Sequence, residues 1–225
     1  MILNVVLKMI LRSWWRNKVF FLVSVASLAL GLACTNLLMT YFVHEHGLEG
    51  RNPDRDRMFF LRQDDPMTEG KRVAFAGAEI PPQLKQSYAE VEDFLRLGKL
   101  DLLYCKVNEQ KVEGDFKMLS ADTTLTSFFD YRTEEGSLSQ VLCQPGKVAL
   151  SEACARRLFG GKQAVGKQVE AHFRFGEART YEVAAVLKER EQSLLQFDML
   201  IAHDPDFFWG GLTLLKLTPG TDAGH

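Results

Sequence analysis

A serine stands where a nucleophile could act, between an apolar strand-like run and a helix-like run. Ser151 lies in "KVALSEACARRLFGG", after Val148–Leu150 and before an alanine- and arginine-rich stretch. A serine nucleophile at a strand-to-helix turn characteristically lies in a GxSxG motif, whereas the residues here are "ALSEA". Ser followed by Glu ahead of an apolar run is typical of a helix N-cap, whose oxygen accepts from free backbone N–H groups. We therefore predict that Ser151 caps a helix and is not catalytic.

The stretch "FGGKQAVGK", residues 159–167, has the glycines and lysine of a phosphate-binding loop. Such loops bind phosphate through backbone amides at the start of a helix, and the GxxxxGK[ST] spacing is absent here. We predict instead that Gly160 ends the helix in a left-handed conformation, with Arg156 and Arg157 near the negative end of the helix dipole.

Five histidines are the candidate metal ligands or bases. His44 and His46 form an HxH pair next to an apolar segment, and the others are His172, His203 and His225. Without an HExxH motif or a Cys/His cluster, the HxH pair is better explained as a solvated turn at a membrane surface than as a metal site. His172 alternates with apolar residues, which predicts a surface or cross-strand position.

Paired acids and an aromatic cluster complete the candidates. Asp64–Asp65 and Glu134–Glu135 read as solvated charge in turns, while Phe207–Trp209 would form either an exposed contact patch or part of a core. No interleaving of basic and aromatic residues points to nucleic acid. No catalytic, cofactor-binding or metal-binding residue is assigned from the sequence.

The elements that would position these residues are many short strands and few helices, which predicts an α+β domain. The expected helices are a short one around residues 80–91, a helical turn in 123–131 and the capped helix 152–159. The expected strands lie at 57–63, 92–100, 102–110, 111–122, 147–150, a hairpin over 168–189 turning at Gly176, 197–202 and 210–220.

A membrane segment precedes this domain. Residues 19–43, "VFFLVSVASLALGLACTNLLMTYFV", carry no charge over 25 residues. This segment is longer than a helix needs to cross a bilayer core of roughly 30 Å, and longer than the apolar core of a cleaved signal peptide. We therefore predict an uncleaved transmembrane helix. Small and hydroxyl residues, with Asn36 near mid-membrane, predict that it packs against other membrane helices.

The charges predict the orientation of this helix. Residues 1–18 carry four basic side chains and no acid, so the remainder of the chain, whose overall net charge is −2, sums to −6. The positive-inside rule then places residues 1–18 in the cytoplasm and residues 44–225 outside it. The apolar spacing in 1–18 predicts either an amphipathic helix on the inner leaflet, contacting membrane lipid, or a helical extension of the span.

The cysteines add little. Cys34 lies in the membrane segment, which leaves Cys105, Cys143 and Cys154 outside, without CxxC or metal-type spacing. One disulfide among these three could form in an oxidising compartment, and no framework is implied.

The order of these features resembles the N-terminal part of FtsX-type ABC transporter permeases with a MacB-like periplasmic core domain. The resemblance covers essentially the whole chain and is most specific at 147–170, where a strand, Ser-Glu, an alanine-rich helix ending in Phe-Gly and "AVGK" leading into a strand follow in the family's order. It also rests on "RDRMFFLRQ", "TSFFDYRTEEGSLSQVL", "YEVAAVLKE" and "LTLLKLTPGTD".

The resemblance implies a non-catalytic permease subunit in the cytoplasmic membrane, without cofactor, driven by a separate cytoplasmic ABC ATPase. It also implies a homodimer or a pairing with a second permease, and an exported domain that transmits the ATPase stroke. Permeases of this family carry further membrane helices after the core domain, whereas this chain stops at His225, so we expect a fragment of a longer permease or a truncated member. The alternatives are a single-span anchored binding or sensor domain and, less favoured, an anchored hydrolase using Ser151 or the HxH pair.

Overall fold

The computed structural model divides into two compact units, Met1–Gly50 and Arg51–His225, each described by itself. The residues that the structure describes are 18–47, 53–64, 71–161, 163–188, 195–204 and 210–221. The predicted amphipathic segment lies outside these residues, apart from Lys18.

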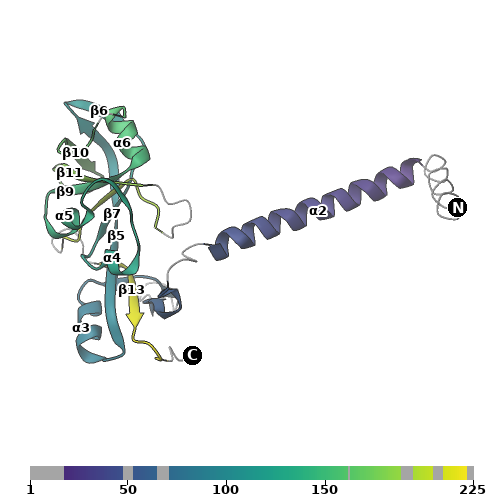
Figure 1. The fold of residues 1–225 in the computed structure, drawn as a ribbon, viewed down its shortest axis with the longest axis horizontal. Helices are drawn as coiled ribbons and strands as arrows, with labels where there is room; N and C mark the ends of the chain where they lie inside the picture. The colour runs from purple at the N-terminus through teal and green to yellow at the C-terminus, as the bar shows by residue number, and fades with distance from the viewer. Residues whose placement is uncertain are drawn as a thin grey trace. The chain divides into compact units, whose positions relative to one another are not determined.

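The first unit contains one long helix, α2 (Lys18–Gly47), drawn in purple in Figure 1. Residues Lys18–Phe42 form a candidate membrane span with a mean hydropathy of 2.0. Its leucines and valines are exposed on all sides of the helix, as is typical of a segment that lipid would surround. The hydroxyl of Thr35 donates to the carbonyl of Gly31 at 2.9 Å, which satisfies this polar group within the helix. The structure confirms the predicted N-terminal apolar helix.

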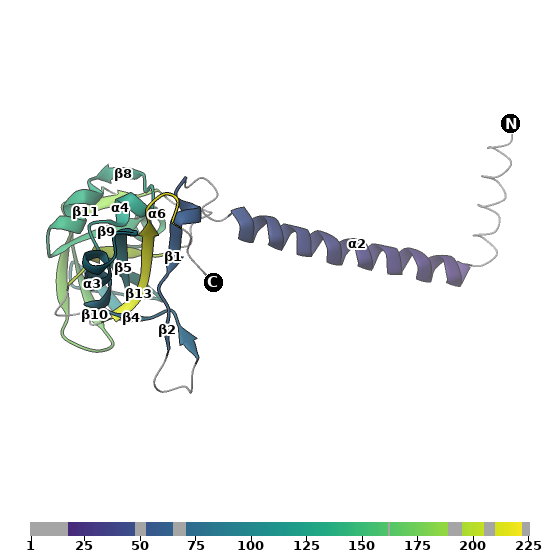
Figure 2. The same ribbon diagram turned by 90° about the horizontal axis from the view of Figure 1, so that it is seen from below.

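The second unit, several of whose strands are labelled in Figure 2, is built on a sheet whose strand pairings close on themselves. Antiparallel and parallel pairings run from β5 to β10, β11, β9, β12 and β7 and then back to β5. The bounds of these strands are β5 (Val91–Val107), β7 (Lys117–Ala121), β9 (Lys147–Ser151), β10 (Gln168–Phe173), β11 (Arg179–Leu187) and β12 (Met199–Ala202). Closure removes free edges from these strands and so protects them from pairing with other chains.

β5 holds this sheet together because its partners change along its length. Its first part pairs with β13 (Gly210–Leu217) and its second part with β10, while on its other side β7 is followed by β6 (Gln110–Glu113). The prediction of two strands at 92–100 and 102–110 is therefore wrong, because the chain continues straight through Asp101 as a single strand.

The predicted single strand 111–122 is instead divided into β6 and β7. The break falls at Gly114–Phe116, where the guanidinium of Arg157 donates to the carbonyl of Glu113 at 2.7 Å. A Cβ atom on residue 114 would lie 1.5 Å from that guanidinium, so the contact requires the glycine. The side chain of Arg157, which comes from a helix distant in sequence, thus donates a hydrogen bond to a backbone carbonyl at the break between β6 and β7.

A smaller set of strands extends the sheet beyond β5. β1 (Met58–Phe60) and β4 (Ala76–Gly77) both pair with β13, whereas β2 (Gln63–Asp64) and β3 (Arg72–Val73) form a separate two-stranded sheet. A one-turn 3-10 helix, η1 (Arg55–Arg57), precedes β1. The predicted helix around 80–91 is confirmed as α3 (Ile80–Ser87), which begins with two prolines, where proline is best tolerated.

Two elements between residues 130 and 145 differ from the sequence expectation. Glu134 and Glu135 are not in a turn but on β8 (Thr133–Gly136), which pairs with β11, and α5 (Leu138–Cys143) follows. The helical turn predicted in 123–131 is confirmed as α4 (Leu125–Phe128). β8 was missed because "TEEG" has no apolar alternation, and its pairing depends on a partner about fifty residues away.

Apolar side chains fill both faces of the closed sheet. On β9, Val148 and Leu150 belong to one core cluster, which includes α6 (Glu152–Phe159), whereas Ala149 faces a second cluster shared with α4 and α5. Burial on both faces explains why β9 and β11 read as nearly continuous apolar runs. The fold is a mixed α+β domain preceded by one apolar helix, as predicted.

Candidate functional site

Ser151 lies at the start of α6, and its surroundings decide between cap and nucleophile. Its Oγ accepts from the backbone N–H of Cys154 at 3.2 Å, which is the N-cap interaction. At the other end of α6, Gly160 has φ 65° and its N–H donates to Arg156 at 2.8 Å. Both the cap and the glycine stop are confirmed, and the glycines therefore end a helix instead of starting an anion site.

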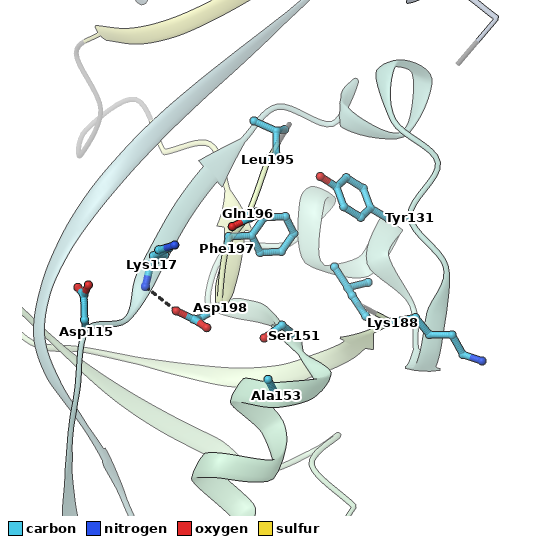
Figure 3. Close-up of a pocket in the computed structure, with 11 residues that line it drawn as sticks. Asp115, Lys117, Tyr131, Ser151, Ala153, Lys188, Leu195, Gln196, Phe197 and Asp198 are labelled. Atoms are coloured by element: carbon cyan, nitrogen blue, oxygen red, sulfur yellow. Dashed lines mark hydrogen bonds between the residues drawn. The ribbon is translucent and has the colours of Figure 1, made fainter. Parts of the chain in front are cut away.

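Ser151 also lines a cavity of about 460 Å³ (Figure 3). Tyr131 and Phe197 form an aromatic wall, with ring centroids 5.6 Å apart, and Lys117 and Asp198 supply charge. Asp198 Oδ2 accepts from the backbone N–H of Lys117 at 2.8 Å, and its own backbone bonds both Lys117 and Ser151. The aspartate therefore joins the start of β7 to the end of β9.

The described lining of this cavity bears on whether Ser151 could be a nucleophile. No histidine is among its described lining residues, and of its two aspartates, Asp115 and Asp198, the latter accepts from a backbone amide. A nucleophilic serine requires a base within hydrogen-bond reach. Among the described residues, the hydroxyl of Ser151 is engaged as a helix cap.

A second cavity, of about 670 Å³, lies near the ends of β9, β11 and β12. Arg179 Nη1 bonds Asp204 Oδ2 at 2.8 Å, which raises the pKa of the guanidinium. Burial lowers the pKa of His203, with the nearby charge of Arg96 acting in the same direction, so this histidine is neutral at pH 7. Burial likewise raises the pKa of Tyr181. The remaining described cation of this cavity, Lys147, pairs with Glu182 at 2.7 Å.

Three of the remaining histidines lie on described elements. His172 lies opposite Tyr104 across β10 and β5 and stacks on it, with ring centroids 4.3 Å apart, which fits the predicted cross-strand position. His44 and His46 fall within the last turn of α2 and not in a turn, since the helix continues to Gly47. Among the described residues, no group of three or more His, Cys, Asp or Glu side chains could hold a metal ion. His225 lies outside the described residues.

The other predicted clusters are only partly visible. Asp64 lies on β2 and approaches Arg72 at 3.6 Å, with both side chains about three quarters exposed. This fits a solvated pair of little energetic weight. Asp65 and the aromatic cluster Phe207–Trp209 lie outside the described residues.

Charged side chains gather instead where the chain enters the second unit. Asp54 accepts from Arg57 at 2.5 Å and from Lys216, and Arg57 also bonds Glu92 and, at 2.6 Å, the carbonyl of Leu217. Lys216 lies 3.6 Å from Glu92, and its side chain is only 9% exposed. We call Asp54, Arg57, Glu92 and Lys216 the N-terminal ion network.

Comparison with known families decides what kind of domain this is. The model of the MacB-like periplasmic core domain matches residues 21–223, nearly the whole chain. The chain belongs to this family. No curated protein sequence matches it.

Two solved structures show the same fold as this MacB-like domain. A domain of a candidate permease from Porphyromonas gingivalis is 19% identical, with a TM-score of 0.60 over 76% of each chain. The extracellular domain of the noncanonical ABC-type transporter YknZ from Gram-positive bacteria is 16% identical, with a TM-score of 0.53 over 72% of this chain and 83% of that one. At these identities the similarity shows the fold.

The cysteines of the MacB-like domain are free thiols in the structure. Cys105 and Cys154 are buried in the same core cluster, and Cys143 is exposed. Burial raises the pKa of Cys105 to about 12 and also raises that of Cys154. No disulfide joins the three, so the one considered from the sequence is not present.

The N-terminal ion network of the MacB-like domain was missed by sequence reasoning. Its members come from residues 54–57, the start of β5 and the end of β13, which no local pattern connects. One signal was available: Lys216 interrupts the apolar run "LTLLKL" of a strand. A lysine at such a position is buried only when it is paired, which implies acidic partners.

Proposed function

We propose that this chain is the membrane-anchored part of a non-catalytic permease subunit of an FtsX-type ABC transporter. A separate cytoplasmic ATPase drives it, and its MacB-like domain transmits that motion outside the cytoplasm. The observation that carries the proposal is the order of the two units, in which an apolar helix long enough to cross a bilayer directly precedes the core domain.

The described catalytic candidates have structural roles. Ser151 caps α6, and in the second cavity Arg179 pairs with Asp204 while burial lowers the pKa of His203. Family membership points in the same direction, because it associates the domain with permeases.

The proposed membrane topology follows the orientation expected from the charges in the sequence. Residues 1–18 lie on the cytoplasmic leaflet, 19–43 cross the inner membrane and 44–225 lie outside the cytoplasm. The basic residues before the helix and the acidic balance after it support this orientation. Two permease subunits, identical or different, pair around the ATPase, and closure of the ATPase moves the membrane helices as rigid levers.

The test is a distance measurement between two copies of the exported domain. Spin labels at Phe175, which is 78% exposed in the turn between β10 and β11, would report the separation in vesicles that also contain the cytoplasmic ATPase. We expect the distance distribution to change when ATP is bound and to return after hydrolysis.

An ATPase variant unable to bind nucleotide is the control, and it should leave the distances unchanged. If the wild-type assembly also gives the same distances with and without ATP, the chain does not transmit motion. A single-span binding or sensor domain would then be the better explanation.

A further inference from the structure

The N-terminal ion network lies at the point where any pull from the membrane helix would first reach the folded domain. α2 ends at Gly47, and Asp54 and Arg57 are among the first described residues after it. β1 begins at Met58, immediately after the network. Along the chain, Asp54 and Arg57 of the network therefore lie between the membrane helix and β1.

β1 alone provides a weak attachment. It is three residues long, and Met58, Phe59 and Phe60 pair with Lys216, Leu215 and Leu214 of β13. One further hydrogen bond, from the N–H of Leu61 to Thr213 at 2.9 Å, continues this ladder. A short strand at the margin of a sheet opens locally at low free-energy cost, so tension would tend to peel it away.

The network adds further attachments to β13 and reaches one more strand, β5. Arg57 bonds Glu92 at the start of β5 and the carbonyl of Leu217 at the end of β13. Asp54 bonds Lys216 of β13. Residues 54–57 are thus fixed to both strands before β1 begins.

The charges within the network are balanced and face one another. Two acids alternate with two bases, and each base contacts both acids. Hydrogen bonds from Lys216 and then Arg57 hold the pKa of Asp54 below its usual value, and the bond to Asp54 raises the pKa of Arg57. Lys216 is nearly buried, which makes its pairs less screened than ordinary surface pairs.

We propose that the N-terminal ion network is a mechanical coupling site, which fixes the segment following the membrane helix to β5 and β13. Its residues act as positioning residues: displacement of the helix moves the sheet as a body instead of detaching β1. This role rests on the proposed function, although the attachment itself can be measured without an ATPase.

Single-molecule pulling on the full chain in nanodiscs tests the attachment. One handle is placed at Gly47 and the other at Phe175, so that force passes through the network, β1, β13, β5 and β10. In Arg57→Met we expect a short first extension, of about ten residues or fewer. Under constant force, the attached state that precedes it should have a lifetime about tenfold shorter than in wild type, because charge-assisted hydrogen bonds have been lost.

Arg156→Met is the matched control, since it removes a surface ion pair between Arg156 and Glu152 within α6. It should leave the first lifetime unchanged. Arg57→Lys, which keeps the charge but loses the forked geometry, should fall between wild type and Arg57→Met. Equal lifetimes in wild type and Arg57→Met, or an equal loss in Arg156→Met, would overturn the proposal.

A second arm separates this proposal from the proposed function. With ATPase present, Arg57→Met should reduce the ATP-dependent change between labels at Phe175, while ATP hydrolysis and the melting of the remaining sheet stay near wild type. If wild type shows no ATP-dependent change but Arg57→Met still ruptures early, the attachment is real and the transporter function is wrong. An undiminished ATP-dependent change in Arg57→Met would overturn the coupling role.

Discussion

At the scale of single residues, the side chains most suggestive of chemistry serve the fold. Ser151 accepts from the start of α6, and Asp198 joins β7 to β9. The residue on which the proposed coupling site depends is instead Arg57, which sequence patterns did not single out. Its three partners come from three segments of the chain.

Removing the hydroxyl of Ser151 tests whether it is only a cap. Ser151→Ala should lower the free energy of unfolding by about 1 kcal/mol, the usual cost of losing an N-cap, as measured by urea denaturation. Ser151→Asp, which can accept the same hydrogen bond, should restore most of that loss. A stability unchanged in the alanine variant would contradict the capping role.

Acid should weaken the N-terminal ion network through Asp54. Because the folded-state pKa of Asp54 lies below the unfolded value near 3.8, its carboxylate stabilises the fold above that pH, and this contribution is lost as the pH falls through the folded-state pKa. The difference in unfolding free energy between wild type and Asp54→Asn should therefore be constant near pH 7 and shrink below about pH 4. A difference that grows as the pH falls would mean that folding does not lower the pKa of Asp54.

At the scale of elements, the fold depends on strand partners that lie far apart in the sequence. α6 with its cap and stop, α3 with its prolines and the hairpin of β10 and β11 were predictable because their signals are local. β8, the division between β6 and β7, and the uninterrupted β5 were not, because each is decided by a distant partner. The N-terminal ion network was hidden for the same reason.

Gly136 is a sharp test of the pairing of β8 with β11. It has φ +76°, and a Cβ there would lie 2.0 Å from the carbonyl oxygen of Ala184. Gly136→Ala should lower the free energy of unfolding by about 3 kcal/mol, combining backbone strain with a clash in a packed region.

Gly146→Ala is the control for that variant. Gly146 has a similar φ of +78° but open space around its Cβ position, so only the backbone cost of about 1–2 kcal/mol should appear. Equal losses in the two variants, measured by urea denaturation, would mean that the steric contact at Gly136 contributes nothing.

At the scale of the whole molecule, both core clusters lie within Arg51–His225. The chain from residue 51 onward should therefore fold without the membrane helix. We expect residues 51–225 to remain in solution without detergent and to show the same near-ultraviolet circular dichroism and cooperative unfolding as the domain in the full chain. Aggregation, or a broad non-cooperative transition, would mean that α2 contributes to the fold.

The positions of the three thiols should allow this domain to be labelled selectively. Cys105 and Cys154 are shielded by packing and disfavoured as thiolates, whereas Cys143, at the end of α5, is exposed. Since alkylating reagents attack the thiolate, a maleimide at neutral pH should modify Cys143 alone within residues 51–225. A fluorophore could then be attached to the native domain without mutagenesis, and Cys105 and Cys154 would become reactive only when the core opens, so their labelling rate would report unfolding.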